Sequence, residues 1–237
     1  MMKNKTIYYK DLGLLDYQKA FDIQTALFEK TKQIKIKNKY KDTPQSTENY
    51  WLFTEHPHIY TLGKSGKEAH LLIDESEQQK RQVQFIKTNR GGDITYHGPG
   101  QIVGYPIIDL ENFGLDILAY MRLLEEVIIS VLALYNIKGE RSKGETGVWL
   151  DVGKPNARKI CAMGVKTSRW VTMHGFALNI DTDLSYFNHI IPCGIKNKGV
   201  TSLQKELGYT PDKNILKQQI LTNFAKLTHA EFIASNF

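Results

Sequence analysis

The sequence lacks the marks of several common protein classes. Only two of its 237 residues are cysteine, Cys161 and Cys193, which argues against a disulfide framework and excludes a cysteine-rich zinc site. No stretch approaches the roughly eighteen apolar residues of a membrane span, and residues 1–30 contain no continuous apolar core. We therefore expect a soluble, cytoplasmic protein that holds no metal ion, with two free thiols.

Motifs of nucleotide and hydrolase chemistry are missing as well. The chain contains no G-x-x-x-x-G-K-[ST] phosphate loop, no G-x-G-x-x-G after a strand, no H-E-x-x-H and no G-x-S-x-G. Nucleotide-binding, zincin and serine hydrolase interpretations therefore have no motif support. We expect no cofactor.

The composition is that of a folded, basic protein. With 41% hydrophobic residues, the chain can bury one substantial core, so we expect a single domain over residues 1–237. The net charge of +6 favours an acidic partner, and nucleic acid, an anionic membrane and an acidic protein all remain open on this ground. Much of the excess lies in Lys30–Lys41, which we interpret as a solvated surface segment that runs into a loop.

Periodicity predicts an α/β or α+β domain with a central sheet. Asp16 is placed to cap a helix in which Ala20, Ile23, Leu27 and Phe28 recur at helical spacing. Tyr50–Thr54 and Ile59–Leu62 look like neighbouring strands. Further strands are expected at 7–9, 83–87, 102–108, 147–150, 159–165 and 171–180, and further helices at 115–135, 201–207 and 213–227.

A glycine-rich segment lies between two of these strands. Residues 90–101 read RGGDITYHGPGQ, and we expect them to form a loop. Glycines allow the backbone to approach a bound group closely, so the exposed N–H groups could bind a carbonyl or an anion. From composition alone, an ordinary connection between strands is an equal alternative.

Cys193 is the candidate nucleophile. It lies in the segment Ile191–Ile195, IPCGI, where proline restrains the backbone before the thiol and glycine leaves the sulfur open. Nucleophilic work at neutral pH needs a nearby cation to lower the pKa of the thiol, and Lys159 is one candidate. A lone cysteine is more commonly a small buried apolar residue, and composition does not decide between the two.

Three segments, in this order and spacing, carry a family resemblance. RGGDITYHGPGQ, RKICAMGVKTSRWVTMHGFALNI and PCGIKNKGVTSL resemble those of the lipoyl(octanoyl) transferases, over about Tyr50 to Leu207. The resemblance implies that Cys193 forms an acyl-thioester and that Lys159 is its catalytic partner. It also implies acyl-chain and carbonyl contacts from Arg90, Gly91, Gly92, Asp93, Ile94, Thr95, Tyr96 and His97, from Ala162, Met163 and Gly164, and from Gly175, Phe176 and Ala177.

The resemblance further implies a fold and a reaction. The fold is a mixed β-sheet flanked by helices, as in the catalytic domain of biotin and lipoate protein ligases. The reaction moves an octanoyl or lipoyl group from acyl carrier protein, through Cys193, to a lysine of a lipoyl domain, which is the first step of endogenous protein lipoylation. The acceptors would be 2-oxoacid dehydrogenase E2 subunits and the glycine cleavage H protein, and the enzyme is expected to be a monomer.

Two other functions compete with this interpretation. An ATP-dependent lipoate or biotin protein ligase would use the glycine-rich segment to hold an acyl-adenylate and would need no catalytic thiol. A non-enzymatic RNA-binding module would rest on the basic charge alone, and it lacks any recognisable RNA motif. We expect neither nucleic acid nor membrane as a partner.

Roles within the site follow as hypotheses. Lys159 favours the thiolate of Cys193 and then serves as base toward the acceptor lysine, with His97 as the alternative base. Tyr96, Met163 and Phe176 form an apolar slot for the acyl tail. Cys161 and His174 are interpreted as structural.

Overall fold

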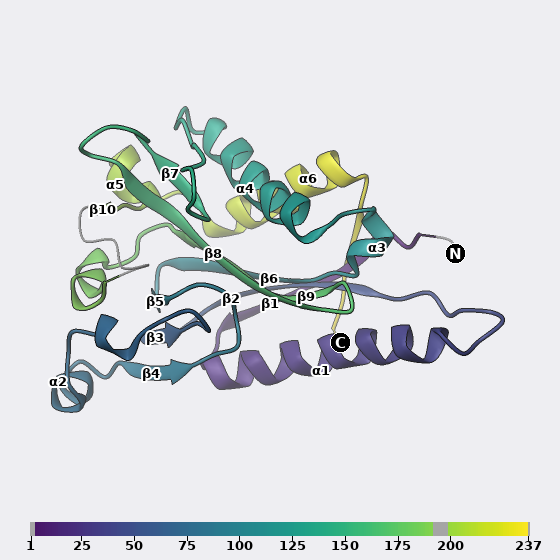
Figure 1. Cartoon of the computed structure of the whole chain (residues 1–237). Helices are drawn as coiled ribbons and strands as arrows, with labels where there is room; N and C mark the ends of the chain where they lie inside the picture. The colour runs from purple at the N-terminus through teal and green to yellow at the C-terminus, as the bar shows by residue number, and fades with distance from the viewer. Residues whose placement is uncertain (1–2, 192–198, 237) are drawn as a thin grey trace.

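A mixed sheet forms the centre of the computed structural model, which describes residues 3–191 and 199–236 (Figure 1). The strand order is β10-β8-β9-β6-β2-β1-β11, with β7 paired to β8, and the pairs β1–β2, β1–β11 and β8–β10 are parallel. This confirms the expected mixed sheet. The strands are β1 Thr6–Leu14, β2 Asn49–Glu55, β6 Gln101–Ile107, β7 Val148–Leu150, β8 Arg158–Ser168, β9 Val171–Asn179, β10 Gly199–Val200 and β11 Glu231–Ala234.

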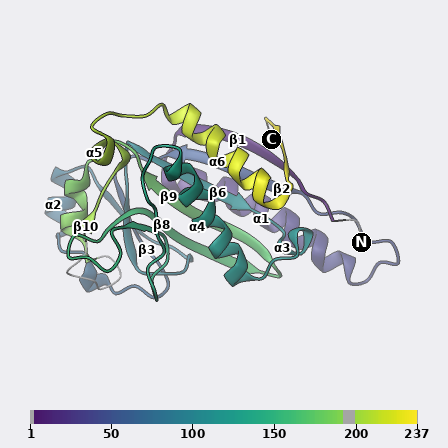
Figure 2. The same ribbon diagram turned by 90° about the horizontal axis from the view of Figure 1, so that it is seen from above.

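Helices cover both faces of this sheet. Helix α4 (Ile117–Ala133) and helix α6 (Lys213–Thr228) pack on one face, and α1 (Tyr17–Asn38) packs on the other (Figures 1 and 2). Because β9 is covered from both sides, every one of its residues is buried. In the described part of the chain, no helix is long and apolar enough to cross a membrane.

A second, smaller sheet corrects two expectations. It has the order β4-β3-β5, formed by Ile59–Leu62 (β3), Gln84–Lys87 (β4) and Ile94–His97 (β5). Strands β2 and β3, which we expected to be neighbours, therefore belong to different sheets. The segment 90–101, which we expected to be a loop, contains strand β5, because the β-prone residues Ile94, Thr95 and Tyr96, together with His97, pair in register with β3.

Helix α1 extends further than predicted. Asp16 caps it, accepting a hydrogen bond from the Lys19 backbone N–H at 3.2 Å, as expected. The lysine-rich segment is helical as far as Asn38, and Lys35 forms ion pairs with Asp109 and Glu111. These ion pairs hold the C-terminal end of α1 beside α3 (Leu110–Phe113). This end of the main sheet lies opposite the end that carries β10 (Figures 1 and 2).

The remaining predicted elements are confirmed with small shifts in their bounds, α5 being Leu203–Leu207. Helices α2 (Glu75–Lys80) and α3, the 3-10 turns Glu68–His70 and Leu184–His189, and strands β10 and β11 were not predicted. Strand β11 is a short edge strand with mostly exposed residues, so only its pairing with β1 makes it a strand.

A buried carboxylate of α4 holds the segment 141–147, which follows this helix, in place. Glu125 is fully buried and accepts hydrogen bonds from Arg122 Nη1 at 2.6 Å, Arg141 Nε at 3.1 Å and the Gly147 backbone N–H at 3.2 Å. Thr146, beside Gly147, donates to the Met163 carbonyl at 3.3 Å. Glu125 therefore holds the segment 141–147 against strand β8.

Replacement of Glu125 should destabilise the fold strongly. Glu125→Ala leaves two guanidinium groups and a backbone N–H without their shared acceptor, and we expect a loss of about 3 kcal/mol in the free energy of unfolding. Urea denaturation measures it. The control is Glu126→Ala, which removes only the half-exposed pair with Arg141 and should cost less than about 1 kcal/mol. Equal losses in the two variants would contradict this account.

Candidate active site

A cavity lies between the main sheet and the segment 90–97, and small side chains form its floor. The strand register places Val103, Ala177 and Ala162 side by side across β6, β9 and β8. Two residues further along β8, and so on the same face of the sheet, Gly164 pairs with Gly175. All five residues line the cavity, because side chains this small leave room above the sheet.

Glycine allows the opposite wall to come close to this floor. A Cβ on Gly164 would lie 2.8 Å from the Gly91 carbonyl oxygen, so only glycine fits there. The Gly91 backbone N–H donates to the Val165 carbonyl at 2.9 Å. The segment 90–92 is thus bonded directly to strand β8.

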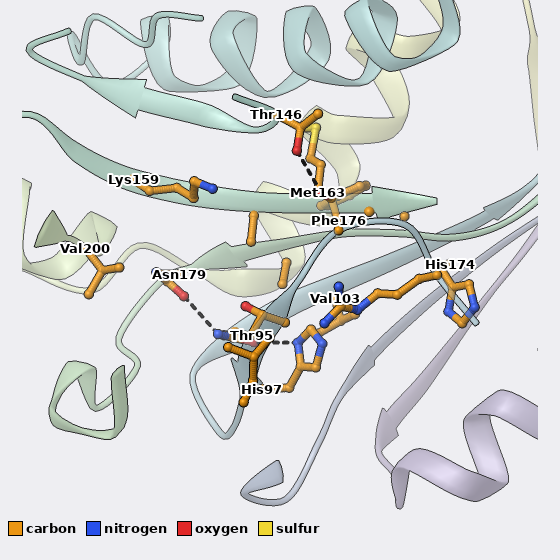
Figure 3. A pocket seen from close by; sticks show the side chains of 18 of the residues that line it. Thr95, His97, Val103, Thr146, Lys159, Met163, His174, Phe176, Asn179 and Val200 are labelled. Atoms are coloured by element: carbon orange, nitrogen blue, oxygen red, sulfur yellow. Dashed lines mark hydrogen bonds between the residues drawn. The ribbon is translucent and has the colours of Figure 1, made fainter. Parts of the chain in front are cut away.

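Most of the predicted site residues meet around this cavity. Its lining includes Arg90, Gly92, Asp93, Ile94, Thr95, His97, Lys159, Ala162, Met163, Gly164, Gly175, Phe176 and Ala177. Figure 3 shows Lys159 and Val200 at one end and His174 at the other. Cys193 lies outside the described residues.

Gly91 and Tyr96 are not part of the lining. Side chains alternate along a strand, so Thr95 and His97 face the cavity while Tyr96 points away. The Tyr96 ring stacks on Tyr186 at 4.9 Å, and its hydroxyl hydrogen-bonds His58 Nδ1 at 2.6 Å. Tyr96, which we expected to contribute to an acyl slot, therefore does not line this cavity.

Met163 and Phe176 border the cavity, but both belong to the core under α4 and α6. The Phe176 ring lies 6.0 Å from Trp51, and a Cβ on Gly104 would collide with it. The open space on the cavity side of the sheet is therefore left by Ala162 and Ala177.

Two charged residues stabilise the wall of the cavity that the segment 90–97 forms. Arg90 is buried, and its Nη2 donates to the Thr61 carbonyl at 2.5 Å and the Thr61 hydroxyl at 2.9 Å. Asp93 accepts from the Ile94 backbone N–H at 2.7 Å and pairs with His70 Nδ1 at 2.5 Å. Both residues fix the shape of the segment 90–94 in addition to lining the cavity.

Lys159 lies at one end of the cavity, beside strand β10 (Figure 3). Its ammonium nitrogen is 4.6 Å from the centre of the Trp149 ring, a cation–π contact. Its carbonyl accepts from the Thr201 backbone N–H at 2.9 Å, and Lys159 pairs with Val200 of β10. Gly199 and Val200 of β10 also line the cavity.

Three histidines near the cavity are neutral at pH 7. Burial lowers the pKa of His56 to about 4 and that of His174 to about 3. Burial, with the nearby His56 and Arg90, lowers the pKa of His97 well below its usual value. His174 bonds Asn89 Oδ1 through Nε2 at 2.7 Å, which agrees with a structural role.

Sequence reasoning missed part of the lining. Gln101 ends the glycine-rich motif and Asn179 ends strand β9, but only the register of β6 and β9 shows that they meet. Other missed lining residues are Tyr17, Val103, Tyr105, Thr146, Trp149, His174, Phe187, Gly199 and Val200. Buried Cys161 packs in strand β8, and burial raises the pKa of its thiol. Among residues 3–191 and 199–236, no group of three or more His, Cys, Asp or Glu could hold a metal ion.

A family model and several curated relatives match nearly the whole chain. The lipoyl protein ligase A/B catalytic domain family matches residues 16–225. The octanoyltransferase of Christiangramia forsetii is 58% identical over 229 residues, covering 96% of this chain and 98% of its own. That of Flavobacterium psychrophilum is 60% identical over 225 residues, covering 94% and 97%.

Solved structures share the fold at low identity. The bipartite lipoate protein ligase of Thermoplasma acidophilum has a TM-score of 0.69 and 14% identity, covering 100% of this chain and 88% of its own. A lipoate-protein ligase A bound with ATP has a TM-score of 0.67 and 13% identity, covering 99% and 89%. At this identity the likeness concerns the fold alone.

The buried histidines predict a loss of stability in mild acid. Below pH 6.5 the unfolded chain protonates His56, His97 and His174, whereas the folded chain does not, so falling pH favours unfolding. Each ring should remove about 1.4 kcal/mol per pH unit, or about 2 kcal/mol at pH 5. Urea denaturation at pH 7 and pH 5 measures the difference.

Matched variants isolate one ring. His174→Gln keeps a donor for Asn89 and should reduce the pH slope of stability by about 1.4 kcal/mol per pH unit. His229→Asn is the control, because His229 is exposed and asparagine tolerates its left-handed backbone. An unchanged slope in His174→Gln would show that His174 is not the buried neutral group described.

Proposed function

The chain belongs to the lipoyl protein ligase A/B catalytic domain family, and on this basis we propose that it transfers an octanoyl group to a lysine of a protein acceptor. The donor is an acyl carrier protein thioester. The acceptors are lipoyl domains of 2-oxoacid dehydrogenase E2 subunits and the glycine cleavage H protein. Octanoyltransferase relatives that align over nearly the full chain support this acyltransferase activity.

One observation of the structure carries the proposal. The cavity has a floor of alanine and glycine, a lysine at one edge, and the ends of β8 and β10 beside that edge. A chain of methylenes fits such a floor, and each buried methylene contributes about 0.8 kcal/mol. The acyl tail would lie over Ala162 and Ala177, with its carbonyl toward Lys159.

The proposed chemistry has two steps. The thiolate of Cys193 attacks the thioester carbonyl, a new C–S bond forms as the carrier's C–S bond breaks, and the carrier leaves as a thiolate that takes a proton from water. The amine of the acceptor lysine then attacks octanoyl-Cys193, forms the amide and gives up a proton, while Cys193 leaves as thiolate. The positive charge of Lys159 favours the thiolate in the first step.

No nucleotide is required by this scheme. Transfer between two thiols is nearly isoenergetic, and transfer from a thiol to an amine is downhill. An ATP-dependent ligase shares the fold, but the ligase structures are only 13 to 14% identical to this chain, and fold does not decide chemistry. We further propose that residues 1–237 form one catalytic domain that acts as a monomer in the cytoplasm, where its carrier-protein donor would be found.

Intact mass tests the covalent step. After incubation with octanoyl carrier protein and no ATP, the wild type should gain one octanoyl group that hydroxylamine removes. Cys193→Ser should gain none, or only a hydroxylamine-resistant ester. Lys159→Met should load more slowly, by about tenfold or more, because the cation that favours the thiolate is gone.

The control is Cys161→Ser, which leaves the proposed nucleophile in place and should load like the wild type. A wild type that gains no mass, yet modifies a lipoyl domain once ATP and free octanoate are supplied, would establish the ligase alternative.

The floor of the cavity should control chain length. Ala177→Val places two extra methyl groups where the tail would lie, so preference should shift from octanoyl toward hexanoyl carrier protein. If the cavity loses room for about two methylenes, the ratio of the rate with octanoyl carrier protein to the rate with hexanoyl carrier protein should fall by about tenfold. The control is Ala133→Val on exposed α4 surface, which should keep the wild-type ratio. An unchanged ratio in Ala177→Val would place the tail elsewhere.

A further inference from the structure

Two buried amides connect His97 to the end of the main sheet. His97 Nδ1 lies 3.2 Å from Gln101 Oε1, and Gln101 Nε2 donates to Asn179 Oδ1 at 2.9 Å (Figure 3). Gln101 Nε2 also donates to the Tyr96 carbonyl at 3.2 Å, and Asn179 Nδ2 donates to the Thr201 carbonyl at 2.9 Å. His97, Gln101 and Asn179 are all more than nine-tenths buried.

Two backbone carbonyls give this chain of hydrogen bonds one direction. A carbonyl oxygen only accepts, so Thr201 fixes which end of the Asn179 amide is nitrogen, and the Asn179 oxygen must then face Gln101. The Tyr96 carbonyl independently requires the Gln101 nitrogen at the same place. The Gln101 oxygen therefore faces His97, and the proton of the imidazole must lie on Nδ1.

We propose that Gln101 and Asn179 are positioning residues that hold the His97 proton on Nδ1 and so present Nε2 to the cavity as a proton acceptor. This role rests on the proposed function, in which the amine of the acceptor lysine attacks octanoyl-Cys193. Nε2 accepts the proton that this amine gives up. The proton moves from the amine nitrogen to Nε2 as the N–C bond forms, and is returned to water after the product leaves.

The surroundings of His97 fit this role. The ring lines the cavity and, within the described residues, no hydrogen bond involves Nε2. Burial lowers the pKa of His97, so the ring is neutral and its tautomer decides which nitrogen can accept. When Nε2 takes a proton, Nδ1–H still donates to Gln101, so the hydrogen bonds of His97, Gln101 and Asn179 stay as they are.

Nitrogen-15 NMR of the imidazole rings tests the tautomer without any substrate. Protonated and unprotonated ring nitrogens differ widely in chemical shift, and the His97 signals are assigned by their loss in His97→Gln. The wild type should show the proton on Nδ1. Gln101→Met, which removes the acceptor at similar length, should move at least half of the population to Nε2–H, and Gln101→Glu, which restores an oxygen, should return it to Nδ1.

The same variants are then acylated and mixed with a lipoyl domain in a single-turnover assay. Gln101→Met should slow transfer to the lysine by about tenfold or more, and Gln101→Glu should recover part of the rate. Asn179→Leu, a second variant farther from the ring, should shift the tautomer less than Gln101→Met. The signals of the other six of the seven histidines report whether each variant is folded.

Three results would overturn the inference. They are a wild-type His97 with its proton on Nε2, a Gln101→Met ring with an unchanged tautomer, and a shifted tautomer with a normal transfer rate. A wild type that never gains an octanoyl group contradicts the proposed function instead. The NMR measurement uses no substrate, so its result on the His97 tautomer does not depend on that outcome.

Discussion

The site depends on the close approach of two backbones at Gly164. The carbonyl oxygen of Gly91 lies only 2.8 Å from the position that a Cβ of residue 164 would take, and the Gly91 N–H donates to the Val165 carbonyl of strand β8. This contact joins the segment 90–97 to the main sheet. Alanine and glycine at the neighbouring positions of β8 and β9 then leave a space that the two layers enclose. A larger residue at Gly164 would separate the layers and open the cavity along its side.

The distribution of charge follows from the same enclosure. Inside the cavity, burial is nearly complete, so ionised rings are costly and the histidines are neutral. Lys159 keeps its place at the edge, over the face of Trp149. The lysine cluster that accounts for much of the net charge lies at the far end of α1, where Lys35 pairs with Asp109 and Glu111. The charge of the whole sequence is therefore no guide to the charge of the site.

Elements that depend on residues close together in the sequence could be predicted, whereas features that depend on pairing between distant residues could not. Helix α1 and its Asp16 cap depend on residues within a few positions of each other, so their pattern is visible in the sequence. Strand β5 depends on pairing with β3 some thirty residues away, and the glycines around it suggested a loop. That error also misplaced Tyr96, whose direction is set by strand alternation. Most of the cavity lining came from the family resemblance, whereas Gln101 and Asn179 required the register. The role of Cys193 stays a prediction.

The fold is shared with a lipoate-protein ligase bound with ATP, so the fold alone does not decide the chemistry, and the proposed transfer depends on how protons are handled around an acyl group that arrives already activated. A thioester needs a thiolate to receive it and a base to accept the proton of the amine. These two requirements conflict, since a cation favours the thiolate while a base must be unprotonated. The described cavity separates them. Lys159 stands at the edge, and His97 stands inside, neutral and held in one tautomer by Gln101. Arg90 also lines the cavity, but its guanidinium is bound to Thr61, so the imidazole oriented by amides is the neutral group that can accept the proton.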